Sequence, residues 1–187
     1  MRYRPRQRRG AVQGMQKGRL RQRTFRAIQL RIPIACVDVL PVREGIASGK
    51  EVGLIFRETP NQGRRWCLIG GRLLINESFR TAIIREVTGA LGEKVQCAVN
   101  DPLQPMYVAE YFSQKRKGKL YDPRQHAIGL TFQVQIKGKI DPRGETLIYQ
   151  WFDVREIPRP ADFGFGQYKV VHDFIKRLQT VSVAATK

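Results

Sequence analysis

The sequence lacks long apolar runs, paired cysteines and, over residues 1–37, any acidic side chain. No run approaches the roughly 18 consecutive apolar residues that a membrane-spanning helix needs, and the N-terminus has no apolar core of a secretory signal. The cysteines Cys36, Cys67 and Cys97 form no CxxC pair, which disfavours a disulfide framework and a zinc site. These absences predict a soluble, cytoplasmic protein with no membrane span, whose cysteines are small buried apolar residues.

Positive charge is concentrated at the N-terminus of this 187-residue chain, whose formal net charge is +18. Residues 1–31 contain ten arginines and one lysine and therefore hold +11 of that charge. The segment is too poor in apolar residues to fold alone, so we predict a basic flexible N-terminal arm there. Nucleic acid, an anionic membrane surface and an acidic partner all fit its electrostatics. A plain disordered tail, a targeting presequence and a translation start at Met15 are the alternatives.

The rest of the chain predicts one domain at 32–180 and a C-terminal tail at 181–187, because an apolar content of 42% can bury one core. Two helices are expected. The first runs over about 77–90, with Asn76 as N-cap and Gly92 as the stop, and the second over about 167–179. Short β-rich runs separated by turn residues predict strands at 32–42, 51–56, 66–69, 94–99, 106–112, 126–136 and 147–154.

The first predicted helix has one carboxylate on its apolar side. Glu86 falls inside the edge of an apolar stripe at helical spacing. The stripe consists of Phe79, Ile83, Val87, Ala90 and Leu91. Burying an unpaired carboxylate costs several kcal/mol, so the fold gives Glu86 either a partner or a function.

The sequence around Glu86 resembles the Nudix box, G-x5-E-x7-R-E-U-x-E-E-x-G-U, where U is an aliphatic residue. The flanks "WCLIGG" and "WFDVREIP" also look like Nudix sequences. Gly89 and Ala90 stand where the family has two adjacent glutamates, and Glu93 replaces the last aliphatic residue. The resemblance implies an α/β fold, a Nudix α/β/α sandwich with a mixed β-sheet, behind the basic arm. The matching positions are Gly71, Glu77, Arg85, Glu86, Val87 and Gly92.

Two roles for Glu86 follow from this resemblance. In active members, three glutamates hold Mg²⁺ or Mn²⁺ against a diphosphate. Here Glu86 is the one that remains, beside the Gly71 carbonyl, so metal binding is expected to be weak unless Glu110 or Asp122 completes the shell. In the other role, Glu86 accepts hydrogen bonds from the backbone of Gly70 and Gly71 while Glu77 pairs with Arg85, and the unit is a structural brace.

A second polar group lies in "YDPRQHAIGLTF", where a turn leads into a strand and gathers Asp122, Arg124, Gln125 and His126 at one strand end. A histidine can act as a general base and an arginine can clamp a phosphate. The chain is similar here to the GDP-mannose hydrolase branch of the Nudix family, whose members use a loop histidine as base. It looks still more like an uncharacterised Nudix-related family in which "VAEYF" precedes "DPRQHA".

The leading hypothesis is a Nudix-type hydrolase of a nucleoside diphosphate derivative, such as a nucleotide sugar. It makes Glu86 and His126 catalytic and Glu86 and Gly71 metal ligands. The alternative is a catalytically inactive Nudix-fold protein that binds a nucleotide, or that associates with nucleic acid or another polyanion through residues 1–31. A homodimer is compatible with both. The residues predicted to bind substrate are Arg72, Arg85, Tyr111, Asp122, Arg124 and Gln125.

Overall fold

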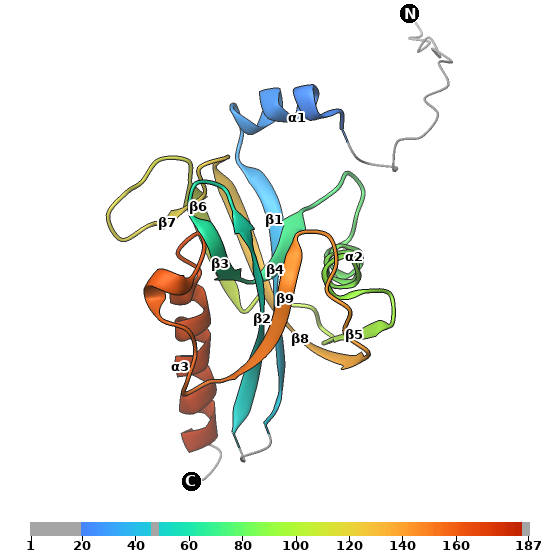
Figure 1. Ribbon diagram of the computed structural model, residues 1–187, viewed down its shortest axis with the longest axis vertical. Coiled ribbons are helices and arrows are strands. Elements are labelled where there is room, and N and C mark those ends of the chain that lie inside the picture. The colour runs from blue at the N-terminus through green and yellow to red at the C-terminus, as the bar shows by residue number, and fades with distance from the viewer. Residues whose placement is uncertain (1–19, 46–48, 185–187) are drawn as a thin grey trace, which may run out of the picture.

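The computed structural model describes residues 20–45 and 49–184, with side chains as far as residue 177. Along this part of the chain, four strands follow the first α-helix and five follow the second before the third α-helix begins, and together these elements build one layered domain (Figure 1). The α-helices are α1 Gln22–Gln29, α2 Phe79–Leu91 and α3 Tyr168–Ala184, and a 3-10 turn spans Pro160–Asp162. The strands are β1 Ile34–Glu44, β2 Lys50–Thr59, β3 Gly63–Cys67, β4 Ile69–Arg72, β5 Val95–Val99, β6 Tyr107–Phe112, β7 Leu120–Tyr121, β8 Ala127–Gly138 and β9 Thr146–Asp153.

Strand β1 is the centre of a mixed sheet. It runs parallel to β8, antiparallel to β4 and, near its end, antiparallel to β2. β8 also pairs with β5 and β6, whereas β2 also pairs with β3 and β9. Val37, Val39 and Leu40 of β1 are fully buried, as expected for an apolar β-branched run whose two faces are both covered.

Helices cover opposite sides of this sheet, with α2 on one side and α3 on the other (Figure 1). α2 packs against β1, β4 and β5 through Ala82, Ile83, Val87 and Leu91. α3 turns an equivalent apolar stripe inward, formed by Val170, Val171, Phe174 and Ile175. The predicted α/β/α arrangement with a mixed sheet is therefore confirmed.

Two local predictions are wrong. In each case a backbone N–H group donates its hydrogen bond to a side chain that the sequence did not indicate. The N-cap of α2 is Ser78, whose hydroxyl accepts a hydrogen bond from the Thr81 N–H at 3.1 Å. Asn76 lies earlier, in a turn with φ of 60°. The predicted strand at 66–69 is divided between β3 and β4. At the break, the Leu68 N–H donates to the Gln167 side chain at 2.9 Å instead of to a neighbouring strand.

The chain also forms structure where the arm and the tail were expected. α1 lies within residues 1–31 and turns Phe25 and Ile28 toward the domain, while Arg23 and Arg26 are exposed. α3 continues to Ala184. Residues 1–19, with the proposed start at Met15, and residues 185–187 lie outside the described residues. None of the helices within 20–45 and 49–184 is long and apolar enough to cross a membrane.

Candidate active site

A cavity of about 790 Å³ lies where α1, α2, β1 and β4 meet the loop that precedes β8. This volume falls within the usual range for small-molecule sites, roughly 300–1,000 Å³. His126 is absent from the lining. All the other residues that the sequence predicts as site residues line it: Gly71, Arg72, Arg85, Glu86, Tyr111, Asp122, Arg124 and Gln125.

The Arg85 guanidinium lies in the cavity wall and links other residues of the Nudix-like box. Its Nε and Nη2 donate to the two oxygens of Glu77 at 2.7 and 2.8 Å, and Nη2 also donates to the Arg72 carbonyl at 3.0 Å. Nη1 donates to Glu86 Oε1. The predicted Glu77–Arg85 pair is therefore confirmed, and the bonds from Arg85 keep the pKa of Glu77 below its usual value.

Glu86 lies directly against Gly71. A Cβ atom at Gly71 would overlap the Glu86 carboxylate, so glycine is what allows helix and strand to approach at this point. The predicted hydrogen bonds from the Gly70 and Gly71 backbone are replaced by the ion pair with Arg85. The reason is that β4 already pairs with β1, with Gly71 opposite Val37.

The donor set around Glu86 does not make a cage for Mg²⁺ or Mn²⁺. Within the described ranges, no three His, Cys, Asp or Glu side chains converge as metal ligands would. Magnesium takes six oxygens in near-octahedral geometry, whereas Glu86 is already paired with a guanidinium. Gly89 and Ala90 line the same cavity, and the space beside Gly89 is open. The missing glutamates would therefore have pointed into this cavity.

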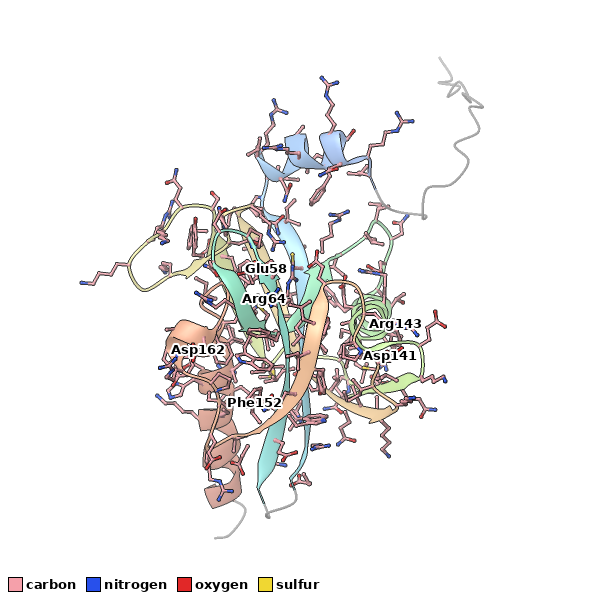
Figure 2. All side chains as sticks on the ribbon, in the orientation of Figure 1. Glu58, Arg64, Asp141, Arg143, Phe152 and Asp162 are labelled. Carbon is pink, nitrogen blue, oxygen red and sulfur yellow. The ribbon has the colours of Figure 1, made fainter. Side chains whose placement is uncertain are left out.

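Polar residues before β8 form the opposite wall and are joined to one another. Asp122 accepts hydrogen bonds from Arg124 Nε and Nη2 at 2.9 and 2.8 Å and from the Arg124 N–H at 3.0 Å. Gln125 accepts one from Gln29 of α1 at 2.8 Å. Arg143, beside α2 in Figure 2, likewise pairs with Asp141 at 2.9 Å. Carboxylates thus hold the guanidinium groups of Arg124 and Arg143, which both line the cavity.

His126 lies on the other face of the sheet. Its Nε2 is 3.2 Å from Glu110 Oε1, and its ring stacks on Phe112 with centroids 5.2 Å apart. Side chains alternate along a strand, and the next residue, Ala127, faces the cavity. Glu110 does not line the cavity either, so it is not placed to complete a metal shell beside Glu86. The role of His126 as a base stays a prediction.

The sequence reasoning missed Asp38, a buried carboxyl in the cavity wall. Tyr111 Oη donates to Asp38 Oδ2 at 3.0 Å, and Gln167 Nε2 donates to Tyr111 Oη at 3.3 Å. Burial raises the pKa of Asp38 to about 6, although the Tyr111 hydrogen bond lowers it, and Asp122 and Glu86 add to the rise. Tyr111 has a buried ring and an engaged hydroxyl, so its predicted contact with substrate is at most an edge contact.

Glycines on both flanking strands make room for the Asp38 carboxyl. A Cβ at Gly70 of β4 would lie 2.5 Å from Oδ1, and one at Gly129 of β8 would lie 2.7 Å from Oδ2. The sequence contains the signal, because Asp38 is the single charged residue in the apolar run 32–42. Only the strand register shows that Gly70 lies opposite Asp38 and that Gly129 lies opposite Cys36, two residues before it on the same face of β1.

Comparisons with known proteins agree on the fold and the family. The model of a family described as "Domain of unknown function (DUF4916)" matches residues 15–175. A protein from Jonesia denitrificans DSM 20603, described as a possible asymmetric diadenosine tetraphosphate hydrolase, is 30% identical, with 75% of this chain and 91% of that chain covered and a TM-score of 0.67. No protein with a curated description matches this chain.

Two more distant structures share the fold alone. The MutT Nudix hydrolase of Burkholderia pseudomallei is 17% identical, with 76% of this chain and 98% of that chain covered and a TM-score of 0.56. The Nudix domain of Shewanella oneidensis NrtR, solved with ADP ribose, is 13% identical, with 85% and 99% covered and a TM-score of 0.54.

The hydrogen bonds that Arg85 makes to Glu77, Glu86 and the Arg72 carbonyl, called the brace, predict that Arg85→Ala strongly destabilises the protein. The substitution leaves the carboxylate of Glu77, whose side chain is 7% exposed, without its partner, so the free energy of unfolding should fall by about 2–4 kcal/mol. Arg80→Ala, on an exposed position of the same helix, should cost less than about 1 kcal/mol. Urea unfolding of both variants measures the difference. Equal losses would contradict the brace.

Asp38 predicts a specific pH dependence of stability. Its pKa is about 6 when folded and 3.8 ordinarily, so between these values the folded state keeps a proton that the unfolded state releases. The free energy of unfolding of the wild type therefore falls as pH rises through this window. Asp38→Asn removes that fall, and its stability relative to wild type should increase by about 2.5 kcal/mol from pH 4 to pH 8. A relative stability that does not change with pH would show that Asp38 does not titrate in this window.

Proposed function

The chain belongs to the family DUF4916 and to the Nudix hydrolase superfamily, and we propose that it hydrolyses a nucleoside diphosphate derivative. One observation carries this proposal: the box residues on α2 and the predicted substrate residues before β8 line the same nucleotide-sized cavity. The related structures point to the same chemical class, since their descriptions name diadenosine tetraphosphate and ADP ribose. A nucleotide sugar, as the sequence suggested, is one member of that class.

In this proposal, guanidinium groups on two walls bind the phosphates. Arg72 lies over the Phe25 ring, with its Cζ 3.8 Å from the ring centroid, and this cation–π contact positions its guanidinium in the cavity wall. Arg124 is held bidentately by Asp122 but keeps 41% of its side chain exposed. A diphosphate between them would receive bidentate, charge-assisted hydrogen bonds.

Asp38, Glu86 and Asp122 are among the carboxyls that line the cavity, and they can act on such a substrate together because Glu86 and Asp122 lie close enough to raise the pKa of Asp38. Asp38 is the one whose raised pKa suits a group that exchanges protons near neutral pH. Glu86 is paired with Arg85, so we propose that it orients substrate; the weak Mg²⁺ or Mn²⁺ site predicted with the Gly71 carbonyl would need oxygens of the substrate to complete its shell. Binding of a polyanion by residues 1–31, a homodimer and a cytoplasmic location stay predictions from the sequence.

The hydrolase proposal is tested by incubating purified protein with Mg²⁺ or Mn²⁺ and with ADP-ribose, diadenosine tetraphosphate, nucleoside diphosphate sugars or nucleoside triphosphates. We expect turnover of at least one class, and at least a tenfold loss of kcat in Glu86→Gln. Turnover of every compound no higher than that of a Glu86→Gln, His126→Ala double variant would overturn the proposal. Tight nucleotide binding without turnover would instead support the alternative of a nucleotide-binding protein, which the Arg85–Glu86 pair favours.

Two single variants identify the proton-transfer group. General acid–base catalysis contributes about 10²–10⁴-fold to a rate, so kcat should fall by that factor when the group is removed. His126→Ala tests the assignment made from sequence, and Asp38→Asn tests the carboxyl that lies in the cavity. Because of that position, we expect the large loss in Asp38→Asn. A large loss in His126→Ala alone would restore the histidine as base.

Rebuilding the box should create metal binding. Gly89→Glu with Ala90→Glu places two more carboxylates in the cavity beside Glu86, and without metal their repulsion should cost on the order of 1–3 kcal/mol. Millimolar Mg²⁺ or Mn²⁺ should recover that loss, since a ligand that binds only the folded state stabilises it. The matched control is Gly89→Gln with Ala90→Gln. Thermal melts that show equal metal effects in both variants would mean that this helix face does not form a metal site.

A further inference from the structure

Helix α1 is part of the cavity wall, although it belongs to the basic N-terminal segment. Phe25 and Gln29 line the cavity. Each of them contacts a predicted substrate residue: the Phe25 ring lies under Arg72, and Gln29 Nε2 donates to Gln125 Oε1 at 2.8 Å. A ligand that contacts Arg72 or Gln125 therefore touches a direct partner of α1.

The outer face of α1 is basic. Arg21, Arg23 and Arg26 are exposed, whereas Phe25 and Ile28 are partly buried, as the helical period of 3.6 residues requires. Figure 2 shows side chains with blue nitrogen tips that extend from α1 away from the strands. Residues 1–37 contain no acid to neutralise this charge. α1 thus presents one face to the cavity and the other to any polyanion.

A second basic segment lies at the same end of the molecule (Figure 1). The loop 113–119 between β6 and β7 exposes Lys115, Arg116, Lys117 and Lys119 and contains no acid. Contacts join the loop to α1. The Arg116 guanidinium lies 4.2 Å from the centroid of Phe112, and Phe112 stacks on His126. His126 directly follows Gln125, the residue that Gln29 holds.

We propose that α1 and the loop 113–119 bind single-stranded nucleic acid, and that this binding is coupled to nucleotide binding in the cavity through the Phe25–Arg72 and Gln29–Gln125 contacts. The coupling rests on the proposed function, because it requires a nucleotide in the cavity. The affinity of the cavity for a nucleotide would then depend on whether the protein has bound a nucleic acid.

An extended polyanion fits this surface better than the other candidates. A membrane-binding helix turns its apolar face outward to lipid, whereas Phe25 and Ile28 of α1 face the domain. The two basic segments project in different directions (Figure 1), and a flexible strand can follow both where a rigid duplex would meet one. Regularly spaced phosphates supply the charge along such a strand.

The sign of the coupling follows from how α1 is held. A helix of eight residues is marginal by itself, so its position depends on a few contacts with the cavity wall. Nucleic acid that orders α1 leaves less disorder for a nucleotide to remove, and binding of the two ligands should be mutually favourable. Coupling of this kind typically changes affinity by about 5–150-fold, equally in both directions.

The experiment uses the full-length protein, a fluorescein-labelled 12-nucleotide oligo(U) and ADP-ribose or diadenosine tetraphosphate. Calorimetry measures the Kd of the nucleotide with and without saturating oligo(U), and fluorescence anisotropy measures the reciprocal effect. We expect the nucleotide Kd to fall about fivefold or more when oligo(U) is bound. In Phe25→Ala, the nucleotide Kd with oligo(U) should equal the nucleotide Kd without oligo(U). This should hold even if the substitution changes the nucleotide Kd itself.

The surface is tested with matched charge reversals. Lys115→Glu with Lys117→Glu should weaken oligo(U) binding at least tenfold and flatten its dependence on salt. Lys137→Glu with Lys139→Glu makes the same change in charge at exposed positions near the far end of β8 and should have little effect. Equal losses of oligo(U) affinity in the two double variants would overturn the proposal that the loop 113–119 binds nucleic acid, since a general loss of positive charge would then explain both.

Separate outcomes distinguish the coupling from the proposed function. Nucleotide binding that oligo(U) leaves unchanged overturns the coupling and keeps the proposed function. Failure of both nucleotides to bind, with oligo(U) still bound, overturns the proposed function and the coupling while the surface stands. Binding to vesicles of phosphatidylserine and phosphatidylcholine without binding to oligo(U) overturns the nucleic-acid surface in favour of a membrane.

Discussion

The Arg85 guanidinium is the interaction on which the candidate site depends. It joins Glu77 in the loop, the Arg72 carbonyl at the end of β4 and Glu86 on the same helix. These bonds fix the position of α2 relative to the sheet and bring Glu86 against Gly71. Since one planar group with five donors satisfies all three partners, lysine at position 85 would not reproduce the arrangement.

The cavity is built at a cost in stability. Asp38 is buried among other carboxyls, and Gly70 and Gly129 give up side-chain packing to admit it. A core made only for stability would carry an apolar residue at position 38, because a buried ionised carboxyl opposes folding. Departures from good packing that cluster in one cavity are typical of functional sites. The missing box glutamates alone therefore do not argue against a function of the cavity, because other departures from a stable core, at Asp38, Gly70 and Gly129, also lie at it.

Sequence reasoning predicted what depends on local pattern. Ile83, Val87 and Leu91 of the predicted stripe are buried, although Phe79 is 39% exposed, and the predicted Glu77–Arg85 pair forms. It could not predict what depends on register between distant strands. His126 and Ala127 are neighbours in sequence but face opposite sides of the sheet, and nothing local shows which of them faces the cavity. Asp38 was missed for the same reason, because Gly129 lies about ninety residues away from it.

α1 shows a different limit of sequence reasoning. Composition predicts a segment that cannot fold alone, but it does not describe what residues 22–29 do when a domain provides contacts. Phe25 and Gln29 find partners in Arg72 and Gln125, and these contacts supply what an isolated eight-residue helix lacks. The same dependence works in reverse, since a change in the cavity wall alters the support of α1. α1 and this part of the cavity wall therefore depend on the same contacts, and a fragment that begins at residue 32 would lack the part of the wall that Phe25 and Gln29 form.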